Sequence, residues 1–214
     1  MSATKSRMGW FGLDAFLAVA GTAGIAVLFL PFDSTLSISP LGAIRMAFTK
    51  PGGWLLGFFA APFFLSILIT GAALRQLISS TLSRAEQSLA YVAAAAMACL
   101  TILLYVLPWV IDPSSDSLDL SSASAKDLLI SLAPAAVLLV GAGLVVRNSR
   151  PGRRRPGNAV MALEVAYLAN FLLCLLSFSD ELGIGAYLAL ITAVVYVVDI
   201  ARFSISVGRH PLPL

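Results

Sequence analysis

The chain has 214 residues, of which 59% are hydrophobic and only 12% are charged, with a formal net charge of +3. Its mean hydropathy is +0.92. Soluble domains carry about 25% charged residues, so this composition excludes a water-soluble globular protein. It is typical of a chain that is mostly embedded in lipid.

Six apolar segments account for most of the chain. A helix needs about 20 apolar residues to cross a hydrocarbon core of about 30 Å. The alternation of polar and apolar residues that marks an outer-membrane strand does not occur in the sequence. We therefore predict an all-α integral membrane protein, a single domain built as a bundle of six transmembrane helices over residues 10–32, 54–74, 88–111, 128–146, 159–178 and 183–203.

Local signals refine two parts of this pattern. Ser39 and Pro40 suit a helix start, and the apolar residues that follow predict a short helix over residues 41–50, either on the membrane surface or as part of a packed loop. Pro62 and Pro134 lie within the second and fourth predicted spans. Because proline removes a backbone hydrogen bond, we expect each of them to kink its helix.

Lysine and arginine are distributed unequally over the gaps between the apolar segments. Eleven of the fourteen lie on one side, and only Arg45, Lys50 and Lys126 lie on the other. Basic residues accumulate on the cytoplasmic side of transmembrane helices, so we predict that both termini are cytoplasmic. The basic character therefore reflects topology and does not indicate nucleic-acid binding.

Three carboxylates lie within predicted spans: Asp14 in the first, Glu164 in the fifth and Asp199 in the sixth. Charged groups are costly in hydrocarbon and mark candidate functional positions. The fifth and sixth spans are joined by a very short turn, so they must be antiparallel neighbours, with Glu164 level with residues 196–199. Arg202 lies one turn farther inward, where it could pair with Asp199 or reach Glu164.

The fifth span carries a stripe of polar residues. Glu164, Tyr167, Asn170, Cys174 and Ser177 follow steps of three or four and so share one helix face. One interpretation is an intramembrane site for a proton or cation, with Glu164 as the titrating group. The candidate residues of this site are Glu164, Tyr167, Asn170, Asp199, Arg202 and Asp14. The other interpretation is a structural network in which Arg202 neutralises Glu164 or Asp199 and holds two helices together.

Several kinds of site lack the residues that they need. His210 is the only histidine, and it follows the last predicted span, so a bis-histidine haem, a zinc site or a histidine-activated nucleophile within the bundle is not available. All three lysines lie outside the predicted spans, which excludes a retinal Schiff base. We expect no catalytic residues, no metal and no cofactor.

Three functions fit these observations. The leading hypothesis is a non-enzymatic structural, accessory or assembly protein that contacts the lipid bilayer and associates with other membrane subunits or with itself. The second is a small proton- or cation-coupled transporter or channel that uses Glu164. The weakest is a lipid-acting membrane enzyme with paired acids.

Overall fold

The computed structural model describes residues 2–32, 37–49, 60–79, 82–111, 125–148, 157–177 and 182–208. Within these ranges the chain is all-helical, as predicted. The elements are α1 (Ser2–Ala26), the 3-10 helix η1 (Val27–Phe29), α2 (Pro40–Thr49), α4 (Ala61–Ser79), α5 (Arg84–Ile111), α6 (Ala125–Asn148), α7 (Gly157–Ser177) and α8 (Ile184–Gly208).

Four helices in the described part of the chain are long and apolar enough to cross a membrane. They are α4, α5, α7 and α8, whose apolar stretches are Pro62–Ser79, Arg84–Leu103, Gly157–Leu175 and Ile184–Ile205. The first and fourth predicted spans correspond to α1 and α6, whose apolar stretches are shorter, Asp14–Phe29 and Leu132–Asn148. The structure thus supports a helical membrane protein.

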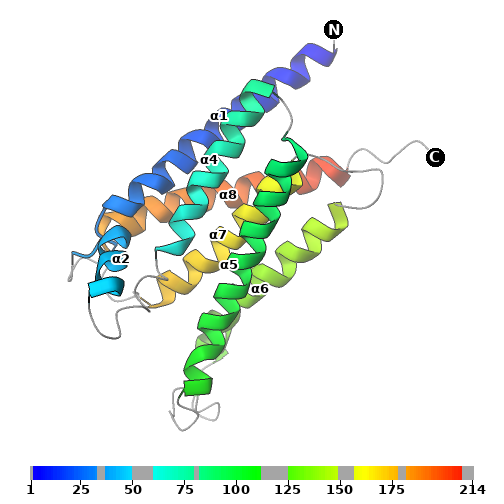
Figure 1. Cartoon of the computed structure of the whole chain (residues 1–214). Coiled ribbons are helices and arrows are strands. Elements are labelled where there is room, and N and C mark those ends of the chain that lie inside the picture. Colours follow the sequence, from blue (N-terminus) through cyan, green and yellow to red (C-terminus); the bar gives the residue numbers. More distant parts are fainter. Residues whose placement is uncertain are drawn as a thin grey trace.

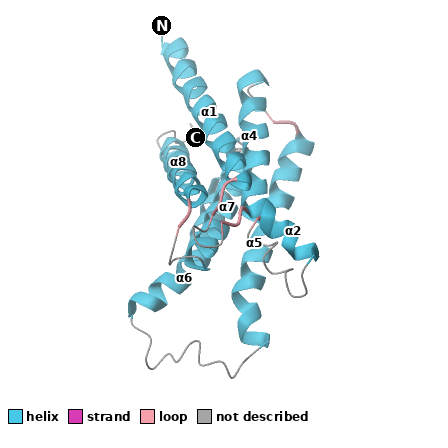
Figure 2. Ribbon diagram, turned by 90° about the vertical axis from the view of Figure 1, so that its left-hand side faces the viewer, coloured by secondary structure: helices cyan, strands magenta, loops and turns pink. Residues whose placement is uncertain are grey.

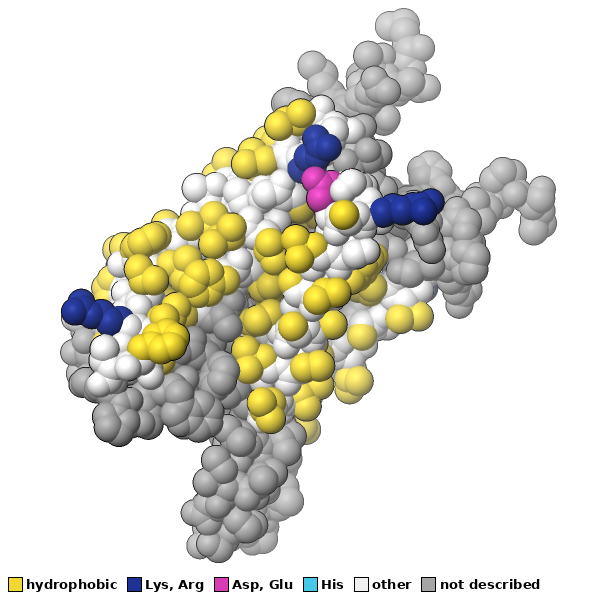
Figure 3. All heavy atoms as spheres, in the orientation of Figure 1, with side chains coloured by type: hydrophobic (Ala, Val, Ile, Leu, Met, Phe, Trp, Pro, Cys, Tyr) yellow, Lys and Arg dark blue, Asp and Glu magenta, His cyan; other side chains and the backbone are white. Residues whose placement is uncertain are grey.

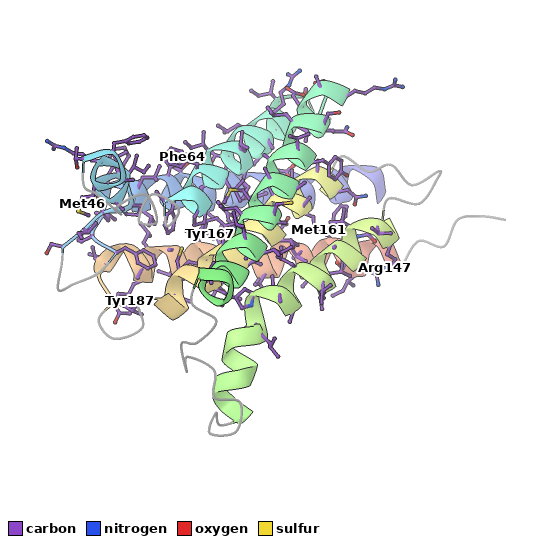
Figure 4. All side chains as sticks on the ribbon, turned by 60° about the horizontal axis from the view of Figure 1, so that its bottom comes forward. Met46, Phe64, Arg147, Met161, Tyr167 and Tyr187 are labelled. Carbon is purple, nitrogen blue, oxygen red and sulfur yellow. The ribbon has the colours of Figure 1, made fainter. Side chains whose placement is uncertain are left out.

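The two prolines have different effects. Helix α4 begins at Ala61, so Pro62 lies in its first turn, where no intrahelical partner is lost. The kink predicted at Pro62 is therefore wrong, and residues 54–59 of that predicted span lie outside the described residues. Pro134 lies inside α6, and this helix bends in its first half, as Figure 4 shows. The bend follows from the hydrogen bond that proline removes.

Helix α7 is the centre of the bundle (Figures 1 and 2). It packs against α4, α5, α6 and α8, whereas α1 packs against α4 and α8. The apolar stretch of α7 is 78% buried, compared with 17% for that of α5. A side chain on α7 is therefore surrounded by protein on almost every side, and a polar group there has to be satisfied by other helices.

Two glycines allow α1 and α4 to approach closely. A Cβ atom on Gly21 would lie 2.2 Å from Thr70 Oγ1, and one on Gly24 would lie 2.3 Å from Ser66 Oγ. Both distances are far below van der Waals contact, so any larger residue would push the helices apart. Small residues at helix contacts are the usual device for close packing in membranes.

At the end of the bundle that holds α2, backbone contacts join distant parts of the chain. Gly183 N donates to Phe32 O at 2.8 Å, and Gly185 N donates to Pro31 O at 2.9 Å. The start of α8 is thus fixed to the end of the first helical segment.

Helix α2 occupies the predicted residues 41–50 almost completely. Gly42 N donates to Ser39 Oγ at 3.1 Å, which is the expected cap.

The exposed surface matches a lipid environment along the helices. Figure 3 shows apolar side chains spread over this face and charged side chains near the ends of the molecule. Exposed apolar residues include Val92 on α5, Leu139 on α6 and Ile191 on α8. A continuous exposed apolar surface of this kind marks a membrane or protein contact.

Candidate intramembrane acid site

Four of the six candidate residues separate into two groups. Glu164 on α7 and Asp199 on α8 are close neighbours, and Asp14 on α1 lies close enough to Asp199 to affect its charge. Asn170, also on α7, contacts α5 instead. Asp199 is thus the electrostatic neighbour of both other acids, and the polar stripe of α7 serves two different interfaces.

Glu164 is the most confined of these groups. Its side chain is completely buried, and within the described part of the chain neither carboxyl oxygen has a hydrogen-bond partner. Glu164 lies seven residues from the start of α7 and thirteen from its end, or about 10 Å and about 20 Å along the axis. The acid is therefore deep in the bundle, nearer the end at which α7 begins.

Asp199 connects Glu164 to the periphery. It is half-buried, and its electrostatic neighbours are Asp14, Glu164 and Arg202. Arg202 is exposed and lies one turn farther along α8. Among the described side chains Arg202 forms no ion pair, and the one salt bridge found joins Arg75 to Glu86, 3.2 Å apart. The sequence hypothesis paired Arg202 with Glu164 or Asp199: among the described side chains Arg202 forms an ion pair with neither, but it is an electrostatic neighbour of Asp199.

An aromatic cluster adjoins the acid through Tyr196. The rings of Tyr167 and Tyr196 meet edge to face with centroids 4.9 Å apart, and Phe171 stacks on Tyr167 at 6.1 Å. Both tyrosine side chains are completely buried, and the Tyr167 hydroxyl has no hydrogen-bond partner in the described residues. Figure 4 shows Tyr167 between the helices, far from the ends marked by Tyr187 and Arg147.

Tyr196 and Ser66 belong to the site although they are not among the candidates from the sequence. Tyr196 is an electrostatic neighbour of Glu164, and its hydroxyl lies beside that of Ser66 on α4. The Ser66 side chain is also completely buried. The signal for Tyr196 was its spacing, since it lies three residues before Asp199 on the same face of the helix. No such signal marks Ser66, because its neighbours come from other helices.

Asn170 holds α5 against α7. Its Nδ2 atom lies 2.5 Å from Thr101 Oγ1 and 3.2 Å from the Met97 carbonyl oxygen, both on α5. The same atom is 3.1 Å from the Ala166 carbonyl oxygen of its own helix. Asn170 is therefore a structural contact. The next stripe residue, Cys174, is buried, and the Ser177 side chain lies outside the described residues.

The chemistry available to this site is proton or cation binding. A charged carboxylate without a hydrogen-bond donor or a cation is very costly in an apolar interior. Glu164 therefore has to carry a proton, or accompany a cation, for as long as it is buried. In the described part of the chain no group of three or more His, Cys, Asp or Glu side chains could hold a metal ion.

Comparison of the chain with known protein families, with curated proteins and with solved structures found no match.

Proposed function

We propose that the chain is an integral membrane protein of six transmembrane helices, with both termini in the cytoplasm, that moves protons through the bilayer by way of Glu164. The observation that carries this proposal is the completely buried and unpartnered Glu164 carboxyl group beside Asp199. Ionisable groups within a membrane that face the bundle interior are typical of proton pathways.

The six-span topology is supported by helix length and by charge. Helices α1 and α6 have 25 and 24 residues, or about 36 Å at 1.5 Å per residue, which exceeds a hydrocarbon core of about 30 Å. With six spans, eleven of the fourteen lysine and arginine residues lie on the side of the termini. This is the side that basic residues mark as cytoplasmic.

The proton role is supported by the order of the acids. Asp14 and Asp199 are half-buried, whereas Glu164 is fully buried. A proton that enters near Asp14 can pass to Asp199 and then to Glu164, and each transfer leaves one carboxylate near the surface, where it is hydrated. A small monovalent cation is a second cargo for the same carboxyl groups, and competition with protons would identify it.

A structural or accessory role is the second candidate. It is supported by α5, most of whose apolar stretch is not buried within the chain, and which exposes Val92, Ile102 and Leu103. Lipid can cover this face, and so can another subunit. In this role Glu164 would stabilise helix packing through its interaction with Asp199 on α8. A lipid-acting enzyme has no comparable support, because a completely buried Glu164 is out of reach of a headgroup.

The topology is tested by labelling single cysteines in intact cells. In a background with Cys99→Ala and Cys174→Ala, a membrane-impermeant maleimide should label Arg45→Cys directly and Arg84→Cys only after permeabilisation. Both positions are exposed. The opposite pattern, or labelling of both positions in intact cells, would contradict the proposed orientation.

The activity is tested with purified protein in liposomes that contain a trapped pH-sensitive dye. A potassium diffusion potential, set with valinomycin, should drive protons inward through the natural chain. Glu164→Gln keeps the shape of the side chain but cannot exchange an acidic proton, so it should reduce the rate to that of protein-free liposomes. An unchanged rate in this variant would end the proposal.

A further inference from the structure

Helix α2 presents an apolar edge to its surroundings. Phe48 is 87% exposed and Leu41 is 43% exposed, and the Ile44 side chain is partly exposed. The three residues follow steps of three and four, so they share one side of the helix. A group of exposed apolar side chains on one side of a helix marks a surface that meets a membrane or another protein.

The other sides of α2 differ from this apolar edge. Pro40 and Ala43 are buried, and the helix packs against η1. Arg45 and Thr49 are exposed, and at 100° per residue the apolar edge lies between them and the packed side. The Thr49 hydroxyl donates to the Arg45 carbonyl oxygen at 2.9 Å, so it is satisfied within the helix. Around its axis α2 therefore passes from a packed side to an apolar side and then to a polar side.

Helix α2 lies at one end of the bundle. Figures 1 and 4 show it across this end, beside the beginnings of α4 and α8. Phe32 N donates to Ile38 O at 2.9 Å, so the chain turns back between η1 and α2. The ten residues of α2 extend about 15 Å, which is too short to cross a hydrocarbon core of about 30 Å. Because the long apolar helices begin and end here, α2 lies at the depth of the membrane interface.

We propose that α2 anchors this end of the bundle in the membrane interface. The apolar edge of Leu41, Ile44 and Phe48 inserts between the acyl chains of the adjoining leaflet, and Arg45 contacts the lipid phosphates. An apolar side next to a basic residue is the pattern of an interfacial helix, which enters the headgroup and acyl boundary by about 5–10 Å. A guanidinium group also matches the geometry of a phosphate group.

Lipid suits this edge better than a second copy of the chain does. In a twofold contact the same surface of both copies meets, so the two Arg45 side chains would come close together. Helix α2 contains no Asp or Glu that could neutralise them. Lipid phosphates supply negative charge at the depth where Arg45 lies. The inference does not depend on the proton path.

The experiment measures the depth of spin labels on the full chain in vesicles of phosphatidylcholine and phosphatidylglycerol. The label is attached to Leu41→Cys, Phe48→Cys or Thr49→Cys, one at a time, in a background with Cys99→Ala and Cys174→Ala. Oxygen concentrates in the hydrocarbon, whereas a nickel chelate stays in the water. The ratio of the collision rates of the label with oxygen and with the chelate therefore reports depth.

Phe48→Cys and Leu41→Cys should give a higher ratio than Thr49→Cys. Thr49 is the matched control, because it follows Phe48 on the same helix and lies on the polar side. Leu139→Cys on α6 and Arg84→Cys at the start of α5 are both exposed and calibrate lipid and water. The ratios of the two apolar positions should lie between those of the calibration positions.

The contact of Arg45 with phosphate is tested by Arg45→Glu in the Phe48→Cys chain. A negative charge next to the phosphates should raise α2 toward the water and lower the ratio at Phe48→Cys. All the replaced positions of α2 are exposed, so we expect every variant to fold, as thermal melting in detergent will show.

Three outcomes would overturn the inference. Equal ratios for Phe48→Cys and Thr49→Cys would show that α2 has no side that faces lipid. Slow collisions of Phe48→Cys with both reagents would show that a second copy or another protein covers the apolar edge. An unchanged ratio in Arg45→Glu would contradict the contact between Arg45 and the lipid phosphates.

Discussion

Replacing Glu164 by leucine should stabilise the protein while it removes the activity. The carboxyl group is completely buried, and its two oxygens have no partner among the described residues. A buried polar group without a partner costs about 1–3 kcal/mol, and an apolar group of similar shape avoids this cost. We therefore expect Glu164→Leu to raise the free energy of unfolding by about 1–3 kcal/mol.

The assay is thermal unfolding of the purified protein in one detergent. For a chain of this size, 1 kcal/mol changes the melting temperature by about 2–4 °C, so an increase of at least about 2 °C is expected for Glu164→Leu. The adjacent, completely buried Leu163 provides the control. Leu163→Ala should lower stability by about 2–5 kcal/mol through the cavity that it leaves, which shows that the assay reports packing at this depth.

A lower melting temperature for Glu164→Leu would refute this reasoning. It would mean that the carboxyl group makes a stabilising contact, as the structural hypothesis from the sequence requires. Glu164→Gln separates the two hypotheses further, because it keeps a polar side chain of the same shape. We expect its stability to stay within about 1 kcal/mol of the natural chain, the size of a typical hydrogen bond between membrane helices, while its proton uptake is lost.

Four further substitutions test the packing of the bundle. Gly183→Ala should destabilise the fold strongly, because the new Cβ would lie 2.5 Å from the Pro31 carbonyl oxygen. Gly71→Ala should be neutral or stabilising by up to about 1 kcal/mol, because nothing lies within 4 Å of the new Cβ. The melting temperatures of the two variants check both predictions. Asn170→Ala should cost about 0.6–2 kcal/mol without loss of proton uptake, and a double-mutant cycle with Thr101→Val in the melting assay should show that the two side chains are coupled. A loss of uptake in Asn170→Ala would place this residue on the path.

The helical architecture could be predicted from the sequence because the hydropathy of consecutive residues is enough to identify a membrane-spanning helix. Apolar stretches of about 20 residues, proline and the cap at Ser39 are local signals, and they located α2 and the longer helices in the described part of the chain. Helix ends were less accurate: α4 begins at Ala61 and not near residue 54, so Pro62 starts this helix and does not bend it. A proline acts differently in a first turn and in a helix interior, and hydropathy does not separate the two positions.

The candidate site could be predicted only in part, for a physical reason. Glu164 and Asp199 were placed together because a short turn joins their helices, so their depth follows from counting residues. The sequence spacing places Asn170 on the same face of α7 as Glu164. Helix α7 is, however, surrounded by four helices, so nearby positions on it contact different neighbours. Ser66 lies on α4, which packs against α1 and α7, and no spacing within one helix reports such a contact.

The most direct test of the central claim is the infrared spectrum of the membrane-reconstituted protein in H₂O and in D₂O, with Glu164→Gln as the reference. If Glu164 exchanges a proton with the solvent, the carboxylic C=O band that is missing in Glu164→Gln will shift when D₂O replaces H₂O. A band that does not shift over hours would show a sealed carboxyl group. That result would contradict a proton path through Glu164.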